Sequence, residues 1–396
     1  MSRSGVISRG IKTPIIKEGD NLIGIVVSSV MEMCKVDKVS LNDRDVIAVT
    51  EAVVGISSGN YATVDQIVAD VKSKFKTKHL GILFPILSRN RFQILLKAFA
   101  RAFDELTIFL SFPKDEVGNN ILDETTLKRL SINPYSDIIT ESDYEKYFSD
   151  FRHKFTGVNM IESYRKVCIG ENTKVNFVLT NNPLDAAKYV DNILVCSIHT
   201  RNEVKSMLKA NKELTVFGLD DILTSSINGS GYNAEYGLLG TNTSNSEKVK
   251  LFPRKDETLV YAIQNRIKEL TGKLVEVMVY GDGAFKDPIG GIWELADPVI
   301  SPIYTKGLEG SPNEVKIKFL VDDKYKDLKS DALTEAIKNE IKSKDSNLTG
   351  QDISLGTTPR RYVDLLGSLC DLTSGSGDRG TPVILIQNYF KNYSEE

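Results

Sequence analysis

The sequence has few of the residues that build soft metal centres or redox centres. Its 396 residues include three histidines and only four cysteines, at positions 34, 168, 196 and 370. The cysteines stand singly and no Cys-x-x-Cys pair occurs, which argues against a zinc site. Together with the lack of a signal peptide, this pattern favours a reducing, cytoplasmic setting.

Long apolar runs and a strong charge of one sign are also absent. No apolar stretch approaches the roughly 18 residues that span a bilayer, so we expect no membrane segment. The net charge is −3, which argues against a nucleic-acid partner. No Walker A motif, dinucleotide fingerprint or Ser/His/Asp signature occurs. The remaining composition, 41% hydrophobic and 26% charged, is typical of a globular chain of two or three domains.

The order of predicted elements divides the chain into three parts. Residues 79–230 alternate buried strands with amphipathic helices, beginning with the strand HLGILFPI and the helix RNRFQILLKAFARAFDE. A strand–helix–strand order implies parallel pairing, so this part is predicted to be a parallel α/β unit. The Gly- and Ser-rich segment SSINGSGYN marks its end. We therefore expect domains at 1–78, 79–230 and 231–396.

An acidic turn follows a strand rich in valine. Within VYGDGAFKDPIGGIWELADP (279–298) stand the carboxylates of Asp282, Asp287, Glu294 and Asp297. Carboxylates at the end of a strand suit Mg²⁺ or Mn²⁺, which take oxygen ligands beside a phosphate. An ordinary turn is the alternative interpretation, because Gly-Asp-Gly and Asp-Pro are common turn formers.

Polar side chains also follow two strands of the predicted α/β unit. Ser88, Arg89 and Arg91 follow the first strand, and the segment FPKDEVGNN, with Asp115 and Asn119, follows the next. Both loops lie on the same side of a parallel sheet, where α/β folds bind ligands. Arginine can also hold a carboxylate with two parallel hydrogen bonds. We therefore predict that these five residues bind a substrate, with plain surface loops as the alternative.

Two further polar segments are less specific. The segment GLLGTNTSNSEKVKLFPR is predicted to be a polar loop, in which Asn242 and Asn245 can bind a metal or a phosphate oxygen. An Asx turn is the alternative for these asparagines. His153, in RHKFTGVN, has no predicted partner beside it and is interpreted as a structural residue.

Five segments, taken in order, resemble the gamma-glutamyl ligase family of the deazaflavin coenzyme factor 420. They are RGIKTPIIKEGDNL, LNDRDVIAVTEAVVGISSGN, GLLGTNTSNSEKVKLFP, VMVYGDGAFKDPIGG and DLLGSLCDLTSGSGDRGTPVILIQN. The resemblance implies an α+β fold of mixed sheets and an intertwined homodimer. The parallel α/β unit is then an insertion into that fold.

The resemblance also implies an activity. In such ligases GTP and a divalent cation, Mn²⁺ or Mg²⁺, activate a substrate carboxylate as an acyl phosphate, and the amine of glutamate attacks it. The partners are therefore a nucleoside triphosphate, glutamate and a carboxylate acceptor. The resemblance implies catalytic roles for Asp282 and Asp287 and metal-ligand roles for Asp282, Asn242 and Asn245. It places the nucleotide beside Pro14, Ile16, Thr50, Glu51 and Ser57.

Three positions depart from the family pattern. A metal-binding aspartate of the family falls on Asn242, a threonine falls on Gly283, and a nucleotide-facing lysine falls on Ala52. These losses weaken metal and phosphate binding unless other groups, such as Asp287 or residues of the α/β unit, compensate. They leave two alternatives open. One is a non-catalytic protein that binds a nucleotide or a carboxylate, and the other is a metal-dependent phosphotransferase or phosphatase.

Overall fold

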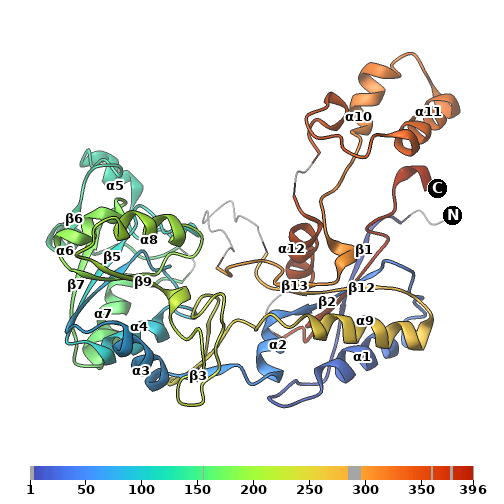
Figure 1. Cartoon of the computed structure of the whole chain (residues 1–396). Coiled ribbons are helices and arrows are strands. Elements are labelled where there is room, and N and C mark those ends of the chain that lie inside the picture. The colour runs from blue at the N-terminus through green and yellow to red at the C-terminus, as the bar shows by residue number, and fades with distance from the viewer. Residues whose placement is uncertain (1–3, 155, 284–295, 358–359, 375–377, 396) are drawn as a thin grey trace.

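The computed structural model describes residues 4–154, 156–283, 296–357, 360–374 and 378–395 (Figure 1). They form a five-stranded, a six-stranded and a three-stranded sheet, with helices packed on them. This mixed content confirms the predicted α+β class. Among the helices in these ranges, none is long and apolar enough to cross a membrane.

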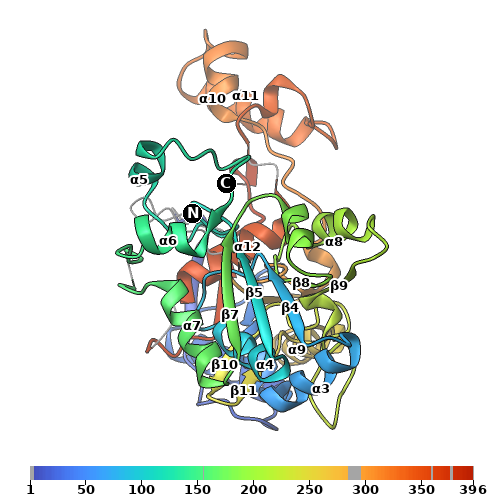
Figure 2. The ribbon, with the colours of Figure 1, turned by 90° about the vertical axis from the view of Figure 1, so that its left-hand side faces the viewer.

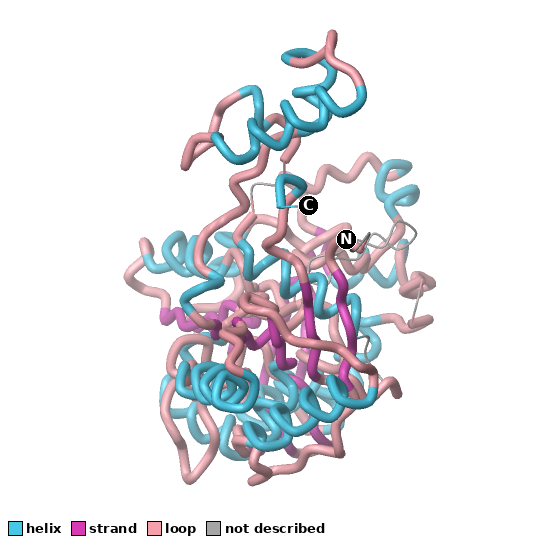
Figure 3. Tube along the Cα trace, turned by 90° about the vertical axis from the view of Figure 1, so that its right-hand side faces the viewer, coloured by secondary structure: helices cyan, strands magenta, loops and turns pink. Residues whose placement is uncertain are grey.

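The five-stranded sheet joins the two ends of the chain. Its order is β1 (Ile7–Ile11), β14 (Val383–Gln387), β2 (Val46–Thr50), β12 (Glu276–Tyr280) and β13 (Ile303–Tyr304). Strands β2 and β12 are parallel, and the other pairs are antiparallel. Because β1 pairs with β14, the two termini lie near each other (Figures 1 and 3).

This sheet is buried on both faces. In β2, Ile47 shares a cluster with helices α1 (Leu22–Val36) and α9 (Glu257–Thr271). Its neighbour Ala48 points the other way and packs with α12 (Tyr362–Ser374). Helices α1 and α9 therefore cover one face and α12 the other, as Figure 1 shows. Burial on both faces explains why β2 and β12 are continuous apolar runs.

The six-stranded sheet is the α/β unit. Its order is β6-β7-β5-β4-β8-β9, and all pairs are parallel except that of the short edge strand β6 (Ile139–Thr140). The parallel pairing confirms the prediction from the strand–helix alternation. Its parallel strands are β4 (His79–Leu83), β5 (Glu105–Leu110), β7 (Lys174–Leu179), β8 (Asn192–Val195) and β9 (Thr215–Gly218).

Helices cover both faces of this sheet. Helices α3, α4 and α7 pack with Ile82 of β4, whereas α8 packs with Leu83 on the opposite face (Figure 2). The connection between β7 and β8, PLDAAKYVD, forms only a short 3₁₀ helix at Pro183–Lys188, although the predicted strand–helix alternation puts an amphipathic helix between successive strands. The helices are α3 (Val64–Lys74), α4 (Gln93–Ala102), α5 (Glu124–Arg129), α6 (Glu141–Tyr147), α7 (Met160–Gly170) and α8 (Arg201–Lys209).

A small sheet connects the α/β unit to the rest of the molecule. The segment that was predicted as a polar loop is a hairpin of two antiparallel strands, β10 (Asn242–Asn245) and β11 (Lys248–Lys250). Strand β11 also pairs with β3 (Tyr61–Thr63) and completes the three-stranded sheet. Ala62 and Val249 of this sheet belong to the same apolar core as α3 and α4. The domain limits at 78 and 230, and the view that the unit is an insertion, stay predictions.

A helical appendage stands above the rest of the molecule (Figures 1 to 3). It consists of α10 (Ile317–Phe319), one π-helical turn (Leu320–Lys324) and α11 (Ser330–Ser343), and has its own small core around Leu320 and Ile337. Helix α11 is rich in charged residues, and its buried side chains are Ile337 and Ile341. Shorter 3₁₀ turns occur at Leu219–Asp221, Lys306–Leu308, Asp352–Ser354 and Tyr393–Glu395.

Two glycines with positive φ differ in how closely other backbone atoms approach them. Gly237 and Gly229 both have positive φ, +52° and +77°. A Cβ at 237 would lie 2.5 Å from two carbonyl oxygens, whereas one at 229 would meet nothing within 4 Å. We expect Gly229→Ala to lower the free energy of unfolding by about 1 kcal/mol, from φ alone. Gly237→Ala should cost about 1–3 kcal/mol more, measured by denaturant unfolding. Equal losses would contradict this prediction.

Candidate active site

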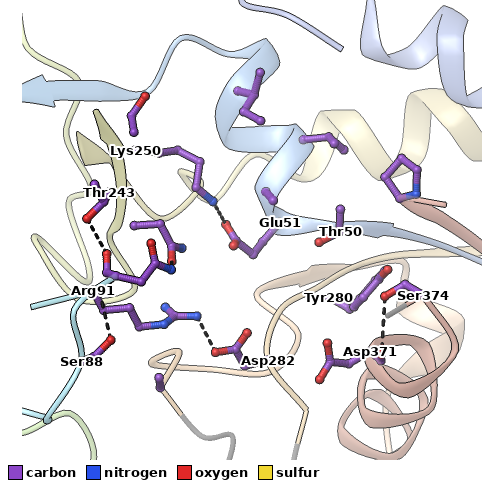
Figure 4. A pocket seen from close by; sticks show the side chains of 18 of the residues that line it. Thr50, Glu51, Ser88, Arg91, Thr243, Lys250, Tyr280, Asp282, Asp371 and Ser374 are labelled. Carbon is purple, nitrogen blue, oxygen red and sulfur yellow. Dashed lines mark hydrogen bonds and ion pairs between the residues drawn. The ribbon is translucent and has the colours of Figure 1, made fainter. Parts of the chain in front are cut away.

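A pocket of about 1230 Å³ lies between the five-stranded sheet and the α/β unit (Figure 4). One wall comes from residues 13–16, the end of β2 and the start of α2 (Glu51–Ser57). The other comes from the loop 86–91 after β4 and the loop after β5. The hairpin β10–β11 and the ends of β12 and α12 complete it. The carboxyl ends of parallel strands from two sheets thus meet at one cavity.

Asp282 lies just beyond β12 and lines the pocket. Its carboxylate is ion-paired with Arg91, which also donates to Asp297 at 2.6 Å. Asp297 in turn accepts the backbone N–H of Asp282 at 2.7 Å. Burial alone would lower the pKa of Arg91, but Asp297 and Asp282 raise it above its usual range. The guanidinium is therefore a permanent cation between two carboxylates.

Two glycines make this arrangement possible. A Cβ at Gly281 would overlap the carboxylate of Asp297, and a Cβ at Gly283 would lie 2.8 Å from the Cα of Ser368 in α12. Backbone atoms of a packed helix cannot move as easily as a side chain. The close approach of α12 therefore explains why the position that is threonine in the family pattern is glycine here.

Asp371 of α12 brings a further carboxyl group to the pocket. It accepts the backbone N–H of Gly283 at 3.0 Å, so it stands next to Asp282. Burial raises the pKa of Asp371, and this hydrogen bond opposes the shift. Asp371 was not predicted from the sequence, because no local pattern indicates which turn of α12 faces the end of β12.

A buried ion pair lies at the start of α2. Lys250 Nζ, from β11, donates to Glu51 Oε2 at 2.6 Å, and the side chains are 8% and 7% exposed. Burial raises the pKa of Glu51, whereas Lys250 lowers it. Glu51 was predicted as a site residue, but Lys250 was not. It comes from the hairpin that was predicted as a loop, where no inward face could be assigned.

The loop after β4 carries three predicted residues to the pocket. Ser88, Arg89 and Arg91 all line it, and Ser88 Oγ accepts the backbone N–H of Arg91 at 3.1 Å. Arg89 is exposed, and none of the carboxylates that the structure describes lies within ion-pair distance of it. Asn119 lines the pocket from the loop after β5. The predicted meeting of these two loops is confirmed.

Asp115 does not line the pocket. Its carboxylate is buried and accepts the backbone N–H groups of Leu87, Val117 and Asn119 at 2.7–3.1 Å. Asn119 Nδ2 is a fourth donor, at 2.9 Å. Burial raises the pKa of Asp115 to about 6, and the hydrogen bonds oppose the shift. Asp115 therefore holds the two loops together, where direct substrate contact was predicted.

The remaining predicted residues divide into two groups. Pro14, Ile16, Thr50 and Asn242 line the pocket. Ser57 and Asn245 do not: Ser57 Oγ donates to the carbonyl of Val54, and Asn245 Oδ1 accepts the backbone N–H of Glu247. The Asx turn was thus the right alternative for Asn245. Asp287 lies outside the described residues.

Histidine was interpreted as structural in the segment RHKFTGVN, but His153 lines the pocket. Its Nδ1 lies 3.2 Å from Thr156 Oγ1, and burial lowers its pKa. Burial therefore favours the neutral form of the ring. Both residues follow α6, so only the tertiary fold brings them to the pocket wall.

The comparison with known families supports this site. A model of the family F420-0:gamma-glutamyl ligase matches residues 10–388. The chain belongs to this family. It is therefore of the ligase class, and the five segments that carry the resemblance fall within the match, apart from the first residue, Arg9. No individual curated protein matches the chain.

The pocket of this F420-0:gamma-glutamyl ligase family member fits a hydrated divalent cation. Among the described residues, no three His, Cys, Asp or Glu side chains gather as a metal site. Mg²⁺, however, usually binds through one or two carboxylates, with waters and substrate phosphates as the other ligands. Asp282, with 27% of its side chain exposed, and its neighbour Asp371 offer such oxygens at one wall.

The buried carboxyl group of Asp115 should make the stability of the fold depend on pH. Its pKa is about 6 in the folded chain against an ordinary value of 3.8, so the folded state binds this proton more tightly. Its contribution to stability is full below about pH 4 and declines as the pH rises from about 4 to about 6. The decline amounts to roughly 3 kcal/mol.

Asp115→Asn is the matched variant for this measurement. The free energy of unfolding of the wild type, minus that of Asp115→Asn, should fall by roughly 2 kcal/mol between pH 4 and pH 6, and by roughly 3 kcal/mol over the whole titration. Denaturant unfolding at half-unit pH steps measures the difference and cancels the contributions of other carboxyls. A difference that stays constant over this range contradicts the assignment.

Proposed function

We propose that this ligase joins the amine of glutamate to a carboxylate substrate, forming a gamma-glutamyl or similar amide bond. GTP and a divalent cation, Mn²⁺ or Mg²⁺, drive the reaction through an acyl phosphate. The ligase class follows from the family. The observation that carries the finer proposal is the position of Asp282, which stands in the pocket beyond β12 and is held by Arg91 of the α/β unit.

Charge supports a cation requirement. Glu51, Asp282 and Asp371 line one side of the pocket, and the buried Asp297 lies behind Asp282. These four carboxyl groups outnumber the two cations paired with them, Arg91 and Lys250. A triphosphate that enters beside these carboxyl groups meets like charge, and this repulsion is strong where water is scarce. A bound Mg²⁺ or Mn²⁺, held by Asp282 and Asp371, would supply charge neutralisation at the phosphate oxygens.

The residues of the α/β unit suit the carboxylate substrate. Arg89 is exposed in the pocket, and its guanidinium can hold a carboxylate with two parallel hydrogen bonds. Ser88 and Asn119 stand on the same wall and offer a hydroxyl and an amide. On the opposite wall, Pro14, Ile16 and Thr50 are proposed to contact the nucleotide. Holding the two reactants in one cavity removes most of the entropy cost of their encounter.

The two chemical steps share this cavity. An oxygen of the substrate carboxylate attacks the γ-phosphorus of GTP, and the bond to the β–γ bridging oxygen breaks, releasing GDP. The amine nitrogen of glutamate then attacks the acyl carbon, and inorganic phosphate leaves. Attack requires the amine to lose a proton. We assign that proton to the leaving phosphate, because Asp371 is taken up by the cation in this proposal.

Asp282→Asn tests the cation site. In the wild type, Mn²⁺ should tighten GTP binding, and in Asp282→Asn this gain should shrink at least about tenfold, because the variant lacks the charged oxygen ligand. Titration calorimetry with and without Mn²⁺ measures the gain. Asp220→Asn is the matched control, since Asp220 pairs with Arg201 at 3.2 Å and is not among the residues that line the pocket. An equal Mn²⁺ effect in Asp282→Asn and wild type rejects the proposal.

Phosphate release separates the ligase from its two alternatives. With GTP, Mn²⁺, glutamate and a deazaflavin that carries a free carboxylate, the ligase releases phosphate only when both substrates are present. Release that needs neither would indicate a phosphatase. Tight GTP binding without release under any condition would indicate a binding protein. A homodimer is part of the same proposal and is measured by sedimentation equilibrium.

A further inference from the structure

We propose that Lys250 is the phosphate-binding cation of the nucleotide site and that Glu51 holds it until the nucleotide arrives. This inference rests on the proposed function, because it requires a nucleotide in the pocket. It goes further by naming the residue that grips the phosphates, which lies far in sequence from the other nucleotide-site residues. It also explains how the chain functions with Ala52 where the family pattern has a lysine.

The position of Lys250 is fixed by the hairpin. Strand β11 pairs with β3, and the backbone N–H of Leu251 donates to the carbonyl of Asn60 at 2.8 Å. Asn60 Nδ2 donates in turn to the carbonyl of Phe252 at 2.9 Å. The aliphatic stem of Lys250 then passes over α2 at Gly55, where a Cβ would lie 3.2 Å from Lys250 Cδ. The ammonium therefore reaches the start of α2 from across the pocket (Figure 4).

The hydrogen-bond inventory of this ammonium indicates a missing acceptor. A lysine ammonium has three donors. Among the described residues, only Glu51 accepts a hydrogen bond from Lys250 Nζ, although the side chain is 8% exposed and lines the pocket. Two donors are thus left for water or a ligand. Phosphate oxygens are strong acceptors that match an ammonium in charge.

In this proposal Lys250 exchanges Glu51 for a phosphate, and both charges of the pair find a new counter-charge. Burial of an unpaired ammonium is costly, so Lys250 needs a carboxylate while the pocket holds no nucleotide. Glu51 supplies it, at the cost of desolvating its own charge. A phosphate that approaches Lys250 provides the same compensation, and Glu51 then lies near the entering divalent cation. Lysine suits this role because it is a point charge on a flexible stem.

Arg91 is the contrasting case. Its guanidinium is already held by Asp297, whose side chain is 1% exposed, and by Asp282. Removing Arg91 would leave two carboxylates unpaired, one of them fully buried, whereas release of Lys250 leaves only Glu51 unpaired, next to the proposed cation. The geometry therefore assigns Arg91 to fixing the acidic side of the pocket and Lys250 to the mobile phosphate contact.

Three variants of the full chain test this assignment. GTP and tripolyphosphate, each with and without Mn²⁺, serve as probes in titration calorimetry. Lys250→Met should weaken both at least tenfold. Glu51→Gln should leave tripolyphosphate binding without Mn²⁺ unchanged or tighter, because Lys250 no longer has a competing carboxylate. Lys248→Met is the matched control, since Lys248 lies on the same hairpin but pairs with the exposed Glu18 at 3.8 Å. It should bind both probes as the wild type does.

The double variant Glu51→Gln/Lys250→Met guards against misfolding. It removes both charges of the pair and leaves no unpaired buried ion. The double variant should therefore keep the wild-type melting temperature, and its affinity for both probes should still be at least tenfold lower. Wild-type affinity for GTP in Lys250→Met, or in the folded double variant, overturns the inference and leaves the proposed function standing. A wild type that binds neither probe overturns both.

Discussion

The active site depends on one interaction, the pairing of Arg91 with Asp282 and Asp297. Arg91 follows β4 of the six-stranded sheet, whereas the two carboxylates follow β12 of the five-stranded sheet. Such a buried charge is tolerated only when it is paired and hydrogen-bonded. The pairing therefore sets how closely the two sheets approach, and it explains why the backbone at Gly281 must lie against the carboxylate of Asp297. The pocket is the space that this contact leaves.

A second set of contacts holds the opposite rim. The hairpin β10–β11 pairs with β3, donates from Thr243 to the carbonyl of Asn90 at 2.7 Å, and carries Lys250 to Glu51. The hairpin follows the α/β unit in the chain, and β3 precedes it. The site is therefore assembled from segments on both sides of that unit, and no part of the chain alone contains it. A substrate in the pocket touches both sheets, so binding and the packing of the two sheets are thermodynamically linked.

Local rules account for what the sequence predicted and for what it did not. Parallel strands, their helices and the loops at their carboxyl ends follow from strand–helix alternation, so Ser88, Arg91 and Asn119 were expected to meet, and they do. Asp371 and Lys250 were not predicted as site residues, because they reach the pocket through pairing between segments that are distant in sequence. Asp115 was placed in the right loop with the wrong role. A carboxylate in a tight loop finds backbone N–H groups nearby before it meets any ligand, and no sequence pattern distinguishes these two outcomes.

The proposed phosphate binding depends on where charges lie in space and not on where they lie in the sequence. Two of the departures from the family pattern, Asn242 and Ala52, are consistent with this. Asn242 removes one carboxylate and Ala52 removes one ammonium, so together they leave the net charge of the pocket unchanged. Asp371, next to Asp282, supplies a carboxyl group where the cation is proposed to bind, and Lys250 supplies an ammonium at the start of α2, next to Glu51. Coulomb energy falls with distance between charges and takes no account of their separation along the chain. A pocket can therefore lose both groups at the expected positions and retain the electrostatic setting that a triphosphate and its cation require.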